Sequence, residues 1–176
     1  PGRTNICDAL QATHHALLSH GFAVEIIRSN CPDAEVGITL SLGQAYPLSD
    51  VEADRLAAQR CDGYHNRWFA DPVFGRGYPE DMLAWYGELA PQIQPGDLDT
   101  IATSIDFLGV NAYCPDFVRA NPDSPLGFRA LTGNKPALAV VGYESTDLGW
   151  PIVPGDLTEL LVRIRAAYAP ISIYIT

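Results

Sequence analysis

The 176-residue sequence is poor in basic residues and has no long apolar run, and each shortage excludes a class of protein. Lys and Arg number 11 against 21 Asp and Glu, so the net charge is −10. An acidic surface repels phosphate groups, and nucleic acid is therefore not expected as a partner. No apolar stretch approaches the ~20 residues needed to span a bilayer, so no membrane association is predicted.

Features of a natural chain terminus are missing at both ends. The start, PGRTNICDAL, has neither an initiator Met nor the basic-then-apolar pattern of a signal peptide. The end, PISIYIT, alternates Ile171, Ile173 and Ile175 with smaller or polar residues, which predicts a strand that stops without a turn or a polar tail. We therefore expect that both ends are cut.

Cysteine is scarce and widely spaced. The four positions, Cys7, Cys31, Cys61 and Cys114, form no C-x-x-C pair. This spacing excludes a sequence-local zinc site and a dense disulfide framework. We expect reduced, mostly buried thiols in a cytoplasmic protein.

Motifs for common cofactors and nucleophiles are also missing. The sequence has no G-x-G-x-x-G, Walker loop, G-x-S-x-G or H-E-x-x-H. Three histidines, His14, His15 and His20, share a predicted helix without the i, i+4 spacing of a metal pair, and His65 stands alone. Packed or surface histidines are the simpler interpretation, so these residues predict no helical metal pair.

Helical and strand patterns alternate along the chain. Helices are predicted over 4–29, 49–69, 79–89 and 156–168, and strands over 36–42, 104–113 and 171–176. Gly21 weakens the first helix locally, and Ser49 with Glu52 predicts a capping box for the second. The Pro- and Gly-rich stretch 114–150 reads as irregular, with one possible short strand in ALAVVG, residues 137–142.

The alternation of strands and helices predicts an α/β fold with parallel strands and helices packed outside. Three strands are too few for a doubly wound domain and suit an arc of a (β/α)8 barrel better. Residues 1–176 would then form a single partial barrel segment. An arc has two unpaired sheet edges, so the remaining strands are expected from elsewhere.

In a (β/α)-barrel the functional residues follow the carboxyl ends of the strands. This rule points to residues 41–46, to residues 111–113 and to whatever follows Thr176. Asn111 and Tyr113 are two apart on one strand, so both point to one face, where an amide and a phenol can bind a polyhydroxyl ligand. The alternative is that Asn111 caps the strand and Tyr113 packs in the barrel.

Three tryptophans have different interpretations. Trp68 and Trp85 lie on predicted helices and are expected in the core, whereas Trp150 lies in a loop. An aromatic ring in a loop near a sugar site can stack on a sugar face, and it can equally serve as a loop anchor. Acidic residues of the helix at 49–62 are expected to form a solvated face.

Several blocks together resemble a known family. HHALLSHGFAV, VGITLSLGQAYP, NRWFADPVFGRGYP, IDFLGVNAY, TDLGWPIVPGDLTELL and PISIYIT occur in the order seen in glycoside hydrolase family 1, the β-glucosidases. The resemblance covers essentially the whole chain. It implies barrel strands five to seven, with the nucleophile Glu immediately after Thr176 and the acid/base Glu before Pro1. No catalytic residue would then lie within this chain.

The resemblance also implies substrate contacts. Asn111 and Tyr113 match a pair near the sugar-cleavage subsite, Trp150 matches a residue of the aglycone side, and Gly43 and Gln44 match positions that shape the aglycone site. This chain departs from the common family pattern at three positions of the site wall: Ser41, Ala112 and Cys114.

The function implied by the resemblance is part of a retaining β-glycosidase of carbohydrate metabolism that hydrolyses β-linked glycosides with no metal and no organic cofactor. Two carboxyl groups about 5–5.5 Å apart give retention through a covalent glycosyl-enzyme. The expected partners are a β-glucoside or oligosaccharide and the complementary segments of the same glycosidase, and the chain alone is expected to be inactive. Two alternatives are a non-catalytic sugar-binding module and a half-barrel that self-associates through its sheet edges.

Overall fold

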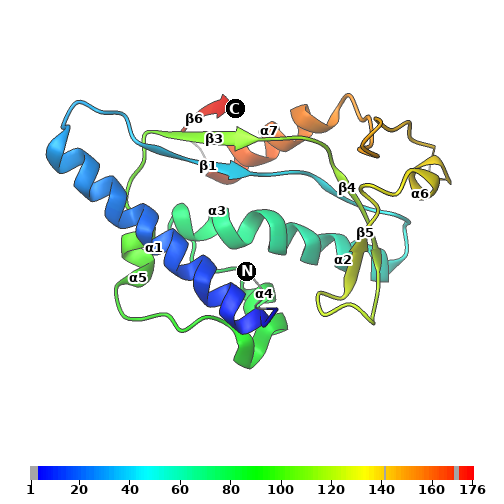
Figure 1. The fold of residues 1–176 in the computed structure, drawn as a ribbon, viewed down its shortest axis with the longest axis horizontal. Coiled ribbons are helices and arrows are strands. Elements are labelled where there is room, and N and C mark those ends of the chain that lie inside the picture. Colours follow the sequence, from blue (N-terminus) through cyan, green and yellow to red (C-terminus); the bar gives the residue numbers. More distant parts are fainter. Residues whose placement is uncertain (1–3, 141, 169–170) are drawn as a thin grey trace. The chain divides into compact units, whose positions relative to one another are not determined.

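The computed structural model describes residues 4–140, 142–168 and 171–176 (Figure 1). The helices are α1 (Ile6–Asn30), α2 (Glu52–Asp62), α3 (Trp68–Val73), α4 (Glu80–Tyr86), α5 (Asp97–Ile101), α6 (Lys135–Val140) and α7 (Asp156–Tyr168), with a π-helix η1 (Gly63–Arg67) and a 3-10 helix η2 (Gly87–Leu89). The strands are β1 (Gly37–Ser41), β2 (Ala45–Pro47), β3 (Phe107–Asn111), β4 (Asp116–Ala120), β5 (Phe128–Ala130) and β6 (Ser172–Ile175).

Two compact units make up the chain. The first comprises the described residues within Pro1–Leu40, Arg67–Gly109 and Ile171–Tyr174. The second comprises those within Ser41–Asn66, Val110–Pro170 and Ile175–Thr176. The second unit holds the carboxyl ends of three strands and therefore the predicted site.

The three strands predicted from the sequence form one sheet. Its order is β1-β3-β6, with β3 in the middle. The fold is thus an α/β segment of a (β/α)8 barrel, as predicted, and this three-stranded sheet is not closed into a barrel over the described residues.

A second sheet, of order β2-β4-β5, was not predicted. It forms where the sequence suggested a loop and an irregular stretch. β2 pairs with β4 in parallel, with Ala45 opposite Asp116, and β4 pairs with β5 in antiparallel, with Val118 opposite Ala130. Sequence patterns miss such strands because β2 and β5 have only three residues each and β4 takes its form from pairing with both of them.

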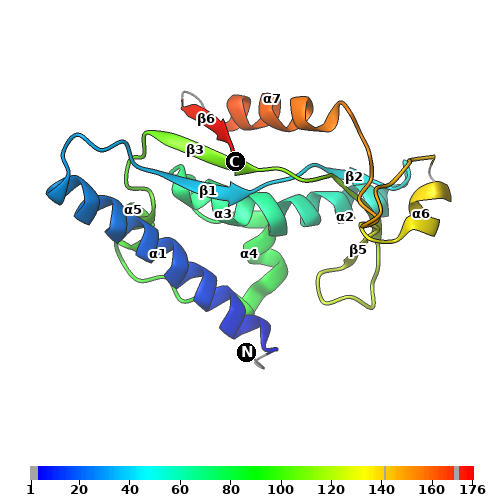
Figure 2. The same cartoon turned by 45° about the horizontal axis from the view of Figure 1, so that its top comes forward.

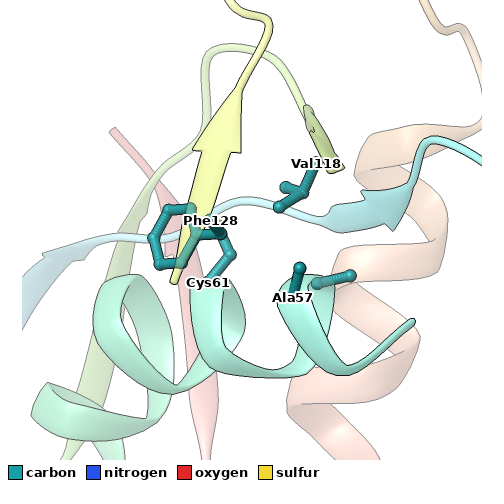
Figure 3. Close-up of a cluster of buried hydrophobic side chains, with 5 residues drawn as sticks. Ala57, Cys61, Val118 and Phe128 are labelled. Carbon is teal, nitrogen blue, oxygen red and sulfur yellow. The ribbon is translucent and has the colours of Figure 1, made fainter. Parts of the chain in front are cut away.

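Helix α2 packs against this second sheet (Figure 2). The contact is a cluster of small and medium side chains from the helix with larger ones from the strands: Ala57, Ala58, Cys61, Val118 and Phe128. Figure 3 shows the Cys61 side chain directed from α2 toward the strand that carries Phe128. The prediction of a possible short strand at ALAVVG is wrong, because Lys135–Val140 is helix α6. Leu138 of this helix packs in a cluster with Phe117 and Leu131. Val141 lies outside the described residues.

In the first unit, helix α1 has the length predicted for it. Its buried residues recur every three or four positions: Leu10, His14, Leu17, Gly21 and Val24. Gly21 was expected to weaken the helix, but a Cβ atom there would lie only 2.0 Å from the Thr100 carbonyl oxygen. The missing side chain therefore allows α1 to approach α5 closely, a contact that can be followed in Figure 1.

The aromatic core of the first unit is centred on Trp68. Its ring centroid lies 4.3 Å from that of Tyr78 and 5.0 Å from that of Tyr86 in an edge-on contact. The prediction that Trp68 is buried is confirmed. The same prediction for Trp85 is wrong, since that side chain is 43% exposed. Helix α4 buries Met82 and Tyr86, which are one turn apart, so the residue just before Tyr86 lies on another face.

His14 is a packed histidine. Its Nδ1 lies 2.9 Å from the Tyr78 hydroxyl and its Nε2 lies 2.9 Å from Asp97 Oδ2. A buried polar ring with both nitrogens bonded fits the structural role expected for it.

The capping box expected at Ser49 and Glu52 is not formed. Val51 is the N-cap of α2, and the Ser49 hydroxyl instead donates to Asp54 Oδ2 at 2.6 Å. The other Asp54 oxygen accepts from the Ala120 amide at 2.9 Å. The Ser49 hydrogen bond, followed by that from Ala120, holds the pKa of Asp54 below its ordinary value. This carboxylate is buried, so the acidic residues of α2 do not all form a solvated face.

All four cysteines are free thiols, but they are not mostly buried. Cys61 is buried, Cys7 and Cys114 are partly buried, and Cys31 is exposed. The cytoplasmic location inferred from them stays a prediction. Among the helices that the structure describes, none combines the length and the apolar character needed to cross a membrane.

Candidate functional site

The candidate site lies in the second unit, where the carboxyl ends of β1, β3 and β6 meet. The amide of Leu42, just after β1, donates to the Asn111 carbonyl at 3.0 Å. The amide of Thr176, just after β6, donates to the Val110 carbonyl at 3.1 Å. The backbone thus brings together three segments that are 65 or more residues apart in sequence, as the barrel rule predicted.

Asn111 is at the centre of this edge. Its side chain is partly buried, and its Oδ1 accepts a hydrogen bond from the Thr176 hydroxyl at 2.7 Å. The amide is therefore held by its neighbour on the adjacent strand and is more than a cap of its own strand. An oriented amide can both donate to and accept from the hydroxyl groups of a ligand.

Tyr113 and Trp150 form an aromatic pair beside Asn111. Their ring centroids lie 5.7 Å apart with the planes tilted by 51°. In this partial barrel segment Tyr113 is 64% exposed. The two rings line a pocket of about 300 Å³ together with Ala112, Cys114, Pro115, Thr146, Pro151, Ile152, Val153, Pro154, Asp156 and Leu157. Exposed aromatic faces beside a pocket suit a sugar ring, whose carbon-bound faces are apolar.

Gly43 is held by its backbone. Its amide donates to Asn66 Oδ1 at 3.0 Å, and its carbonyl accepts from Asn66 Nδ2 at 2.7 Å. A Cβ atom on Gly43 would lie 3.3 Å from the Cys114 carbonyl oxygen, a tight contact. Next to it, the Gln44 carbonyl accepts from the Asp116 amide at 2.8 Å. Both predicted residues therefore sit in a fixed loop close to Cys114 and Asp116.

Sequence reasoning missed the residues that hold this loop. Asp62 Oδ1 accepts from Asn66 Nδ2 at 2.7 Å and also bonds Arg163 of α7. Arg163 in turn lies 3.5 Å from the Gly43 carbonyl oxygen. The i, i+4 spacing of Asp62 and Asn66 on one helical face was a visible signal, but the partner on α7 is 101 residues away and no local pattern reveals it.

Two polar groups at the pocket have shifted pKa values. Burial, followed by the negative charge of Glu159, raises the pKa of Asp156 above its ordinary value. Burial, with the nearby Asp116 and Asp156 carboxylates, raises the pKa of Cys114 to about 11. Cys114 is therefore a neutral thiol at pH 7 and a poor nucleophile. The groups that converge on the strand ends are an amide, hydroxyls and aromatic rings, which bind polyhydroxyl ligands.

Comparison with known proteins adds the family. All residues, 1–176, match the family described as glycosyl hydrolase family 1. A β-glucosidase of Agrobacterium sp. is 38% identical over 176 residues, which are 100% of this chain and 38% of that protein. The crystal structure of a β-glucosidase from Exiguobacterium marinum superimposes with a TM-score of 0.88 at 39% identity, covering 100% of this chain and 39% of that one.

A third similar protein was solved with a ligand. The virulence factor SghA of Agrobacterium tumefaciens, in complex with its substrate analog salicin, has a TM-score of 0.87 at 32% identity. It is matched over 100% of this chain and 38% of its own. The chain thus spans about two fifths of the length of the relatives that it matches.

Proposed function

Because this chain belongs to glycosyl hydrolase family 1, we propose that it is the part of a retaining β-glycosidase that lies between the two catalytic glutamates. The whole enzyme hydrolyses β-linked glycosides, with β-glucosides as the first class to test. The nucleophile follows Thr176 and the acid/base precedes Pro1, so residues 1–176 supply binding and positioning. This segment by itself is inactive, because neither proton donor nor nucleophile is present.

One observation carries the proposal. The carboxyl ends of β1, β3 and β6 are hydrogen-bonded side by side, and Asn111 accepts from Thr176, the residue that would precede the nucleophile. An amide in that place lies within reach of both a nucleophilic carboxylate and the sugar hydroxyl groups next to the reacting carbon. Hydrogen bonds to such a hydroxyl strengthen in the transition state of glycoside hydrolysis.

Each predicted site residue has a role under this proposal. Asn111 binds the sugar beside the cleaved bond, and Tyr113 offers its hydroxyl to the nucleophile and its ring to the pocket. Trp150 stacks against the aglycone. Gly43 and Gln44 shape the aglycone side through a loop of fixed backbone.

A chimeric enzyme tests the proposal. The segment of the Agrobacterium β-glucosidase that matches this chain is replaced by residues 1–176. The chimeric enzyme is expected to hydrolyse an aryl β-glucoside and to release the β-anomer first, whereas the isolated 176-residue chain shows no hydrolysis above background. Hydrolysis by the isolated chain would contradict the proposal. A chimeric enzyme that unfolds cooperatively but has no activity would also contradict it.

Two variants of the chimera test the assigned residues. Asn111→Ala is expected to lower kcat/KM by about 10²-fold or more, the usual loss when a transition-state hydrogen bond is removed. Tyr113→Phe keeps the ring and is expected to lower kcat more than it raises KM. The matched controls are Asn30→Ala on α1 and Tyr64→Phe on η1. Each is expected to leave kcat and KM unchanged. Equal losses in variants and controls would contradict the assignment.

The second candidate is a sugar-binding module without chemistry. The pair formed by the exposed Tyr113 and the partly buried Trp150 is the feature that favours it. It requires that the isolated chain binds a β-glucoside in a calorimetric titration and that Trp150→Ala abolishes the binding. A chain that binds no sugar alone but restores activity in the chimera excludes it.

A further inference from the structure

Outside the predicted sugar site, three ligand-type side chains converge in the second unit. The Cys61 thiol, a ring nitrogen of His65 and a carboxylate oxygen of Asp116 all lie within 4.8 Å of one another. We propose that these three residues bind a zinc ion, with a water molecule as the fourth ligand. Metal binding at these residues can be tested whether or not the proposed glycosidase activity is correct.

The chemistry of the donor set selects the ion. Sulfur, imidazole nitrogen and carboxylate oxygen are the three ligand types that Zn²⁺ uses in proteins. Magnesium and calcium prefer oxygen alone, so a thiolate and an imidazole disfavour them. Three protein ligands leave one tetrahedral position for water.

Local structure explains why the three meet. Cys61 lies at the end of α2 and His65 in the π-helix η1 that follows, four residues apart, so both point to one side of the helix. π-Helical segments are uncommon and often occur at functional sites. Asp116 begins β4, and α2 packs directly on β4.

Each ligand has a supporting neighbour. The Thr132 hydroxyl donates to Asp116 Oδ1 and orients the carboxylate. The Tyr64 ring contacts the His65 ring edge-on, with centroids 4.9 Å apart. Cys61 is only 1% exposed and is held in the apolar cluster of Figure 3, which keeps competing water from the sulfur. Such outer groups orient metal ligands and tune their affinity.

The geometry requires little adjustment. Zinc–ligand distances of about 2.0–2.3 Å place the ligand atoms of a tetrahedral site about 3.5 Å apart. No two of the present ligand atoms lie more than 4.8 Å apart, and small rotations of the exposed His65 ring and of the partly buried Asp116 carboxylate can bring them to the tetrahedral spacing. An ion enters from the exposed His65 side.

The occupied site would brace the predicted sugar-binding loops. Asp116 lies three residues after Tyr113, and its amide donates to the Gln44 carbonyl at 2.8 Å. A bound ion would therefore link the helical segment α2–η1 to the start of β4, which lies close to Tyr113 and Gln44. The simpler interpretation is that Cys61 is a core thiol beside the surface histidine His65. It predicts that the chain binds no stoichiometric Zn²⁺, so a metal titration distinguishes the two interpretations.

Titration with Zn²⁺ against a chromophoric chelator tests the site in the isolated chain and in the chimeric enzyme. One high-affinity equivalent is expected, and Co²⁺ in its place should give the near-ultraviolet charge-transfer absorption of a cobalt–thiolate bond. His65→Ala and Cys61→Ala each weaken binding by at least about 100-fold. Thr132→Ala, which removes only the supporting hydroxyl, weakens it by about 10- to 100-fold.

The control is Cys31→Ala, which removes an exposed thiol far from the cluster in sequence and leaves binding unchanged. Circular dichroism of each variant separates ligand loss from unfolding, and His65→Ala removes an exposed side chain, so it keeps the fold. The proposal is overturned if no 1:1 binding occurs, if Co²⁺ gives no thiolate band, or if His65→Ala and Cys31→Ala behave alike.

Discussion

Asp156 illustrates how one buried carboxylate sets a pH dependence. It is the first residue of α7 and lines the pocket beside Trp150. Burial, followed by the charge of Glu159, raises its pKa in the folded state above the unfolded value of 3.8. Between these two values the folded state binds more protons, so stability falls as pH rises through this window and stays reduced above it.

Asp156→Asn is therefore expected to stabilise the chimeric enzyme at pH 7, because the amide has no charge to bury. The gain should shrink as the pH falls through 3.8, because the native carboxyl then becomes increasingly protonated in the unfolded state as well as in the folded state. Urea unfolding at pH 7 and pH 3.5 measures the difference. Asp123→Asn, an exposed carboxylate in the β4–β5 turn, is the control and should show no such pH-dependent gain. Equal stabilisation at both pH values would contradict the argument.

At the scale of elements, the loop after β1 depends on a side chain from a helix. Asn66 bonds both the amide and the carbonyl of Gly43 and also bonds Asp62. Asn66→Ala leaves the Gly43 amide without its acceptor and removes the shorter of the two hydrogen bonds to the Gly43 carbonyl, which also accepts from Arg163 at 3.5 Å. Leaving one partly buried group unsatisfied costs about 1–3 kcal/mol, and losing one hydrogen bond costs about 1 kcal/mol. We expect the chimeric enzyme to lose about 2–4 kcal/mol of stability and to show a higher KM for aryl glucosides.

The measurements for Asn66→Ala are urea unfolding and steady-state kinetics. Asn30→Ala, at the exposed end of α1, is the matched control and should change stability by less than about 0.5 kcal/mol. If Asn66→Ala alters stability without altering KM, the loop does not shape the aglycone side, and the role assigned to Gly43 and Gln44 fails.

The elements themselves were largely predictable from local pattern. The apolar periodicity of α1, the short apolar runs of β1 and β3 and the alternating pattern of β6 each specify their own structure. Strands β2 and β5 were missed because they have only three residues each, and β4 because it takes its form from pairing with them. The ALAVVG interpretation failed at Ala137–Val140 because an apolar run of this length fits a helix as well as a strand, and Leu138 packs from a helix here.

For the whole molecule, the order β1-β3-β6 makes β1 and β6 the outer strands of the sheet among the described residues. Unpaired strand edges associate with other edges. The isolated chain is therefore expected to show a solution mass above its 19.1 kDa by light scattering, while the chimeric enzyme does not self-associate through this sheet.

A charge on the outer strand tests this edge. Ile175→Lys places a cation on an exposed side chain of β6 and is expected to reduce self-association of the isolated chain. Ile152→Lys adds the same charge to a similarly exposed loop position and should have little effect. A monodisperse 19.1-kDa chain with a cooperative melt would contradict the prediction.

The amino-acid sequence by itself determined the fold class, the family resemblance and the strand-end positions of Asn111, Tyr113, Gly43 and Gln44. These follow from periodicities and motifs that are local in the chain. Only the tertiary structure decided which residues hold them in place. Asn66 and Arg163 bond to Gly43, and Thr176 donates a hydrogen bond to Asn111. The Trp150 ring lies beside that of Tyr113. The same holds for the convergence of Cys61, His65 and Asp116. Such contacts join residues tens of positions apart, and they form because burial and backbone pairing bring distant elements together.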